Sequence, residues 1–208
     1  MKRLLLLSLF VLVGCPTDSP GDPSDPTPGV ESAGPAASVK GDLKLKRWRQ
    51  ISRDLEGALA LPPEAICNET GQYPCSTFHA VPLGGTSVEN GLFRSVDTVS
   101  VTTGLTFERF VLSACWERLR RDLDPEEDAE APVVFGHLPA DGTKLDPDAA
   151  GRQVVDLYRR LLGRDPLPEE TDAVVAMHAG IVEDGGTHAE WAVMACFAVG
   201  STTEGLMY

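Results

Sequence analysis

Cysteine and histidine are the side chains whose types and spacing in this chain could support chemistry. Cys75 precedes His79 by four residues, in the sequence CSTFH. A zinc site would need two further ligands, and covalent haem attachment would need a Cys-x-x-Cys-His motif, which the sequence lacks. We therefore interpret Cys75 as a disulfide cysteine beside a loop histidine, and we expect no metal and no other cofactor.

A second candidate site involves His178 and His188, which flank a turn containing Glu183 and Asp184. Two histidines and one carboxylate are a common ligand set for transition metals. The two histidines are separated by a loop, however, and lack the i, i+4 spacing of a helical histidine pair. His188 also falls in the sequence THAE, a capping-box pattern that accounts for its position. We expect no metal here.

Hydrolase and calcium chemistry are not indicated by the remaining polar residues. Ser113 and Ser201 lack a Gly-x-Ser-x-Gly setting and an evident histidine partner. The acidic run Asp122 to Ala131, DLDPEEDAEA, lacks the glycine and ligand spacing of an EF-hand loop. We interpret this run as a solvated loop. No residue is assigned a catalytic role, and we expect a protein that is not an enzyme.

Residues 1–15, MKRLLLLSLFVLVGC, have the layout of a secretory signal. Lys2 and Arg3 provide a positive start, and an apolar run from Leu4 to Val13 follows. This run is too short for a transmembrane helix, which needs about 20 residues. A plain signal peptide is the nearer alternative, but the residues before Cys15 fit its small-x-small cleavage pattern poorly.

The last four residues of this segment, Leu12-Val13-Gly14-Cys15, resemble a bacterial lipobox. The resemblance implies that residues 1–14 are a lipoprotein signal peptide that is cleaved before Cys15. It also implies a diacylated thiol and an acylated amino group at Cys15, with palmitate as a typical chain, so that the protein is anchored in a membrane by lipid. By analogy with enterobacterial sorting, Pro16 in place of aspartate favours the outer membrane.

Four further cysteines, Cys67, Cys75, Cys115 and Cys196, belong to the exported part of the chain. Four cysteines in such a compartment indicate two disulfides, for which three pairings are possible. The first two bracket CNETGQYPC, whose glycine and proline suit a folded-back loop, and the other two lie in helical patterns. The most economical pairing is Cys67–Cys75 with Cys115–Cys196.

Composition divides the chain into three parts. After the signal peptide, residues 15–40 contain the lipidated cysteine and a stretch rich in proline, aspartate and serine, which we expect to be a disordered tether. Residues 41–208 are long enough to form one domain with a real core. The formal net charge of −13 argues against nucleic acid as a partner and against a domain lying flat on an anionic membrane surface.

Apolar periodicity predicts a mainly α fold, a small domain of about five helices with a long disulfide-stapled loop region after the first. Capping residues support the later helices: Asp146 precedes a proline, and Gly163 follows the next apolar stripe. Val182 is expected on the core face of the fourth helix. The predicted helices cover residues 42–60, 106–122, 147–163, 168–185 and 188–199.

Between the first two helices the pattern is weaker. Residues 64–102 are interrupted by glycine and proline, and Ser95 to Thr102, rich in valine and hydroxyl residues, is predicted as one short strand. Thr106 is predicted to be the N-cap of the second helix. The three tryptophans, Trp48, Trp116 and Trp191, all fall in helical patterns, and we expect them in the core.

The last part of the sequence resembles a helical C-terminal module of uncharacterised planctomycete proteins that often also carry cytochrome c modules. The shared features are Leu157-Tyr158, an arginine-rich turn, Pro168 opening a helix, and a helix containing Trp191. A bacterial helical module of unknown function that contains Leu-Tyr-x-x-Leu-Leu-Gly-Arg is an equally good relative. The resemblance covers about 60 residues; it implies a helical fold and brings no known activity or catalytic residues.

Together these observations predict an envelope-anchored lipoprotein with a non-enzymatic binding or structural role. Its expected partners are the membrane, through the lipid anchor, and an unidentified envelope protein. The alternative is a periplasmic enzyme or redox accessory protein with a site in residues 64–102. An enzyme should have a concave pocket with convergent polar groups, whereas a binding protein should have an exposed apolar patch.

Overall fold

The computed structural model describes residues 44–69, 73–87, 91–94, 99–123, 131–139 and 145–207. These residues belong to one compact unit, Asp42–Tyr208. The predicted signal peptide, the lipidation site Cys15 and the predicted tether lie outside the described residues. None of the helices within the described ranges is both long enough and apolar enough to cross a membrane.

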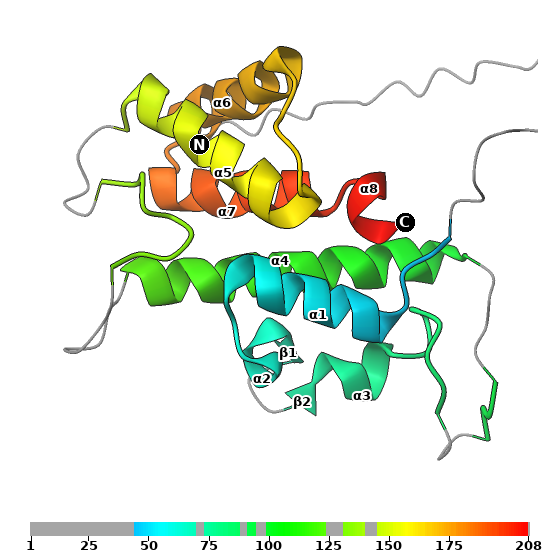
Figure 1. Ribbon diagram of the computed structural model, residues 1–208. Helices are drawn as coiled ribbons and strands as arrows, with labels where there is room; N and C mark the ends of the chain where they lie inside the picture. The colour runs from blue at the N-terminus through cyan, green and yellow to red at the C-terminus, as the bar shows by residue number, and fades with distance from the viewer. Residues whose placement is uncertain are drawn as a thin grey trace, which may run out of the picture. The chain divides into compact units, whose positions relative to one another are not determined.

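The fold is mainly α, as predicted, and its arrangement is shown in Figure 1. Among the described residues, five helices have twelve or more residues, and a two-stranded antiparallel hairpin lies between the first two of them. The elements in chain order are α1 (Trp48–Leu59), α2 (Pro63–Ile66), β1 (Asn68–Glu69), β2 (Tyr73–Pro74), α3 (Cys75–His79), α4 (Val101–Leu123), α5 (Pro147–Leu162), α6 (Pro168–Glu183), α7 (His188–Gly200) and α8 (Thr203–Leu206).

Helix α4 occupies the middle of the domain. Helix α7 packs along one side of it, while α1 and α2 pack along the other (Figure 1). Helices α5, α6 and α7 contact one another, and α1 also reaches α5. The core between these helices contains the fully buried side chains of Ile51, Val111, Leu157 and Trp191. The Trp191 indole N–H donates to the carbonyl oxygen of Val174 at 2.9 Å, which satisfies its polar atom inside the core.

Two disulfides hold these elements, and they are the pairs that the sequence predicts. Cys67 and Cys75 join the two ends of the β1–β2 hairpin, with Cα atoms 5.3 Å apart. Cys115 of α4 is bonded to Cys196 of α7, with Cα atoms 5.9 Å apart and a separation of 81 positions in sequence. The second bond therefore fixes α4 against α7, the pair with the most extensive contact among the described helices.

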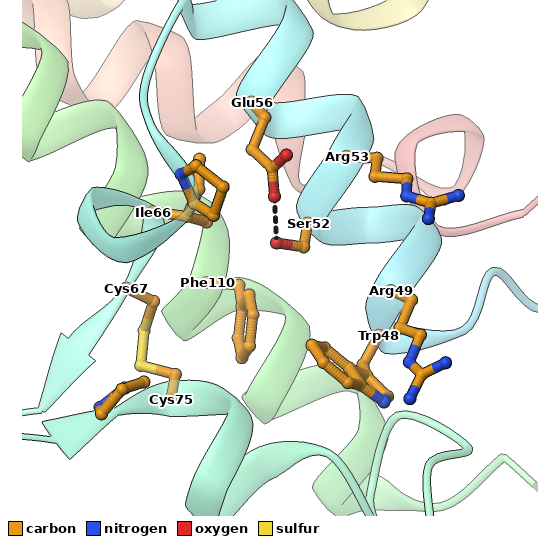
Figure 2. Close-up of a pocket in the computed structure, with 11 residues that line it drawn as sticks. Trp48, Arg49, Ser52, Arg53, Glu56, Ile66, Cys67, Cys75 and Phe110 are labelled. Atoms are coloured by element: carbon orange, nitrogen blue, oxygen red, sulfur yellow. Dashed lines mark hydrogen bonds between the residues drawn. A yellow bond between two sulfur atoms is a disulfide. The ribbon is translucent and has the colours of Figure 1, made fainter.

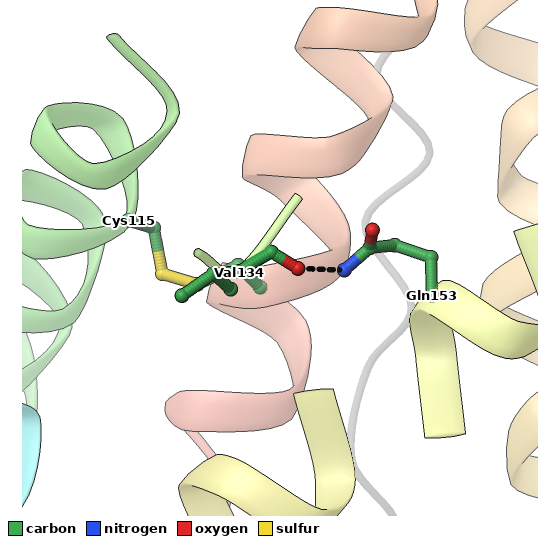
Figure 3. The surroundings of a disulfide bond; sticks show 4 residues. Cys115, Val134 and Gln153 are labelled. Atoms are coloured by element: carbon green, nitrogen blue, oxygen red, sulfur yellow. Dashed lines mark hydrogen bonds between the residues drawn. A yellow bond between two sulfur atoms is a disulfide. The ribbon is translucent and has the colours of Figure 1, made fainter. Parts of the chain in front are cut away.

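The segment 131–139 connects α4 to α5 through buried polar contacts. From α4, the Asp122 carboxylate accepts hydrogen bonds from the backbone N–H groups of Val133, Val134 and Phe135 at 2.8, 3.0 and 2.9 Å. From α5, the Gln153 amide donates to the carbonyl oxygen of Val134 at 3.0 Å, next to the Cys115 disulfide (Figure 3). An irregular segment can be buried here because side chains satisfy its backbone groups.

The predicted caps of α5 and α7 are confirmed. The Asp146 carboxylate accepts from the Ala149 N–H at 3.2 Å, and Gly163 adopts the left-handed conformation, with φ 69°, at the end of α5. Thr187 and Glu190 form a reciprocal capping box at the start of α7. These side chains bond to N–H groups that the first helical turn leaves without partners.

The start of α4 differs from the prediction. The helix begins at Val101 and residues 99 and 100 form no strand, so the predicted strand is wrong at residues 99–102, while its first part at 95–98 lies outside the described residues. Thr106 is a buried residue inside the helix and not its N-cap. Local capping accompanies this start, because the Ser100 N–H donates to the Thr103 hydroxyl at 3.1 Å. The same buried hydroxyl donates to the carbonyl oxygen of Pro82 at 2.9 Å and ties this end of α4 to the turn after α3.

Three further predictions need correction. The first helix begins at Trp48, because Leu45 forms an isolated bridge with Met207 instead. Val182 is exposed near the end of α6. Trp116 is not a core residue: 56% of its surface is accessible. The core tryptophan is Trp191, and Trp48 is partly buried against the core.

Candidate functional site

The exposed Trp116 lies in an apolar groove between α4, α7 and α2. The groove has a volume of about 1010 Å³, within the range of ligand-binding clefts. Leu112 and Trp116 of α4 line it together with Val193 and Met194 of α7 and Ala65 of α2. We call this surface the α4–α7 groove.

Both disulfides brace the α4–α7 groove. Cys115 precedes Trp116 on α4, and its bond to Cys196 fixes α4 against the α7 segment that carries Met194. Cys67 itself lines the groove at the end of α2, and its bond to Cys75 holds the adjoining hairpin. The exposed apolar side chains are therefore displayed on a crosslinked framework, which lowers the entropy that ordering costs on binding.

Charged side chains accompany the apolar ones, and they include Glu64, Arg109, Glu117, Arg121 and Glu190. Glu117 accepts hydrogen bonds from Arg120 at 2.9 Å and from Arg121 at 2.8 Å. These hydrogen bonds, first that of Arg120, lower the pKa of Glu117. The pKa shift thus has a structural cause in an ion-pair cluster on α4, and mixed charge beside an apolar surface is typical of a protein-binding site.

The sequence interpretation missed this surface because α4 is apolar on two sides. The predicted stripe, which contains Phe107, Phe110 and Leu119, is buried as expected. A second apolar stripe occupies another face of α4 and remains exposed. In the sequence it could be recognised by large apolar residues that recur at i, i+4, i+11, i+15 and i+22. Its members are Val101, Leu105, Leu112, Trp116 and Leu123.

No group of three or more side chains that could hold a metal ion occurs in the described part of the chain. Cys75 is in a disulfide at the start of α3, and the partly buried His79 is at the end of this helix. His178 packs edge-on against Trp191, with ring centroids 5.5 Å apart. His188 is the first residue of α7, directly after its cap.

The two candidate serines and the start of the acidic run lie elsewhere in the structure. Ser113 lines the α4–α7 groove, and Ser201 ends α7, donating its N–H to the carbonyl oxygen of Phe197. Asp122 is a buried helical residue, so the prediction of a solvated loop is wrong at this position, while residues 124–130 lie outside the described residues.

A second cleft borders the region in which the alternative function would place a site. Figure 2 shows it between α1, α2 and the Cys67–Cys75 disulfide, with the Phe110 ring at its centre. Its volume is about 470 Å³. The Ser52 hydroxyl donates to the Glu56 carboxylate at 2.7 Å, so these two polar groups are bonded to each other.

No protein-family model, curated protein or solved structure matches the chain.

Proposed function

We propose that this chain is a lipid-anchored protein of the bacterial cell envelope, without enzymatic activity, that binds a partner protein through the α4–α7 groove. The observation that carries the proposal is the exposure of Trp116 in an apolar groove braced by two disulfides. Large exposed apolar patches on soluble domains are typical of interaction sites, and tryptophan is enriched among residues that dominate binding energy.

The sequence supports the cellular setting of this proposal. The lipobox-like Leu12 to Cys15 would place the protein on a membrane, with Cys15 as the acylated residue, and Pro16 favours the outer membrane. The two disulfides suit an oxidising compartment outside the cytoplasm. Several acyl chains on one cysteine would exceed what stable anchoring requires.

The partner surface that fits the groove is the apolar face of a helix. The exposed stripe of α4 runs from Val101 to Leu123, which corresponds to about 33 Å of helix. Such a long and narrow apolar surface suits an amphipathic helix laid along it, whose large side chains enter the groove beside Trp116. Arg109 and Arg121 would face acidic residues of the partner, and Glu190 would face basic ones.

Site-specific crosslinking in intact envelopes tests the groove. A photoreactive amino acid at Leu112 should give a discrete adduct with a protein other than a second copy of this chain. The same amino acid at Val182, an exposed apolar position on α6, serves as the control and should not. Trp116→Ala should remove the adduct and weaken binding of the purified partner by about 30-fold or more, as expected of a central tryptophan.

Equal adducts from both positions, an adduct that survives Trp116→Ala, or an adduct with a second copy of this chain would contradict the proposal. Lipidation is tested separately by intact mass. The mature protein should begin at Cys15 and carry acyl chains, and Cys15→Ser should release it from the membrane. An unlipidated chain that begins elsewhere would refute the anchor without affecting the groove.

A further inference from the structure

A second surface gathers positive charge in a chain whose formal net charge is −13. It is a groove of about 790 Å³ at the start of α1. No aspartate or glutamate occurs among the described residues that line it. We call it the arginine groove, and its main members are Arg47, Arg49, Arg53 and Arg94 with the aromatic residues Trp48 and Phe93.

The backbone brings these residues together from two separate segments. The Trp48 N–H donates to the carbonyl oxygen of Leu83 at 3.0 Å, which joins the start of α1 to the turn after α3. Gly85 allows the close approach, because a Cβ at this position would lie 2.8 Å from Cδ1 of Trp48. Two backbone hydrogen bonds between Ser87 and Leu92, at 3.1 and 2.8 Å, then place Phe93 and the next residue beside α1.

The acidic residues of α1 do not line this groove. Asp54 forms an ion pair with Lys46 at 3.0 Å. Glu56 lines the neighbouring cleft shown in Figure 2. Within the described ranges, Arg49, Arg53 and Arg94 form no ion pair with a carboxylate, so the arginine groove has a local excess of positive charge.

The aromatic residues give the groove an apolar component. Phe93 exposes 73% of its surface and has no polar atom to hydrate. The Arg49 guanidinium lies over the Trp48 ring, 5.5 Å from its centroid. Arginine combined with exposed aromatic rings suits the boundary between lipid headgroups and acyl chains, where the charge meets phosphate and the ring leaves water.

We infer that the arginine groove binds the anionic phospholipid headgroups of a membrane surface. The position in the chain supports this occupant, because the arginine groove begins within a few residues of the predicted tether, which ends at residue 40. The net acidity of the chain does not oppose local contact, since electrostatic interactions are screened beyond about 10 Å. The contact would orient a domain that the proposed lipid anchor already holds near the membrane.

Vesicle sedimentation tests the inference on residues 15–208 with Cys15→Ser, so that no acyl chain contributes. Vesicles of phosphatidylglycerol mixed with phosphatidylcholine should bind the protein, and vesicles of phosphatidylcholine alone should not. Binding should weaken when salt is raised from about 50 to about 300 mM. Arg49→Gln with Arg53→Gln should reduce affinity on the order of 25-fold, from about 5-fold for each arginine.

A matched control removes two arginines from another exposed surface, Arg152 and Arg159 on α5, and should leave binding unchanged. Phe93→Ser should weaken binding without changing its salt dependence. Equal loss in the control, equal binding to both vesicle types, or tighter binding to duplex DNA would overturn the inference. Release by inorganic phosphate, but not by chloride at the same ionic strength, would assign the groove to free phosphate and also overturn it. Failure here leaves lipidation and the α4–α7 groove unaffected.

Discussion

Replacing Asp122 by alanine should be among the most damaging single changes in the domain. Its side chain is 1% exposed and forms an ion pair with Arg118 at 2.7 Å, one turn earlier on α4. The same carboxylate accepts three backbone N–H groups of the segment 133–135. One buried carboxylate therefore neutralises a buried guanidinium and accepts three backbone N–H groups at the entry of this segment.

The expected loss of stability follows from the buried groups that Asp122→Ala leaves without a partner. Arg118 would remain buried without its counter-ion, which typically costs about 3–5 kcal/mol. At least one of the three backbone N–H groups would stay buried without an acceptor, at about 1 kcal/mol or more. The other two can reach water if the segment opens. We therefore expect Asp122→Ala to lower the free energy of unfolding by about 4–6 kcal/mol, a large share of a typical domain's stability.

Urea unfolding monitored by circular dichroism measures this change. With a slope of about 2 kcal/mol per molar urea, the midpoint should fall by about 2–3 M. Adding Arg118→Met to Asp122→Ala should recover part of the loss, because the unpaired charge is then gone. Asp172→Ala, at an exposed position of α6, is the control and should change stability by less than about 0.5 kcal/mol. A fall below about 0.5 M for Asp122→Ala, or a double variant less stable than the single one, would refute the reasoning.

Two other predictions follow from the helix packing and the charge clusters. Serine at both Cys115 and Cys196 should lower the free energy of unfolding by about 4–5 kcal/mol, the chain-entropy value for a loop of 81 residues; a urea midpoint equal to that of the oxidised protein would contradict this. The pKa of Glu170 is lowered to about 2, first by hydrogen bonds from Arg164 and then by the Leu167 N–H. The ionised Glu170 carboxylate therefore stabilises the fold fully above pH 4.5, and this stabilisation is lost as pH falls towards about 2. Glu170→Gln should therefore reduce the dependence of the urea midpoint on pH in this interval, and an unchanged dependence would argue against the assignment.

The parts of the fold that could be predicted from sequence depend on local signals. The ends of α5 and α7 follow from Asp146, Gly163 and Thr187, because caps and left-handed residues act within one helical turn. The disulfide pairs were predictable from cysteine spacing together with the requirement that two helices meet in one core.

The parts that could not be predicted depend on contacts between distant segments. The Thr103 hydroxyl is buried against the carbonyl oxygen of Pro82, 21 residues earlier in the chain. Asp122 reads as part of an acidic loop, yet it is buried because the segment 133–135 folds back onto it. The residues next to Thr103 do not identify Pro82 as its partner, and those next to Asp122 do not identify the segment 133–135.

Trp116 illustrates the same limit for function. Periodicity shows that α4 has apolar residues on two faces, but it does not show which face the rest of the domain covers, since a helix that is apolar all round is usually buried. Helix α7 covers the face that includes Cys115, and the next residue, Trp116, remains exposed. Because the disulfide fixes α4 against α7 at this point, the geometry of the proposed binding groove depends on the oxidised protein. Under the proposed function, export, disulfide formation and binding would be linked, because the compartment that the lipobox-like signal implies would also favour the disulfide that fixes α4 against α7.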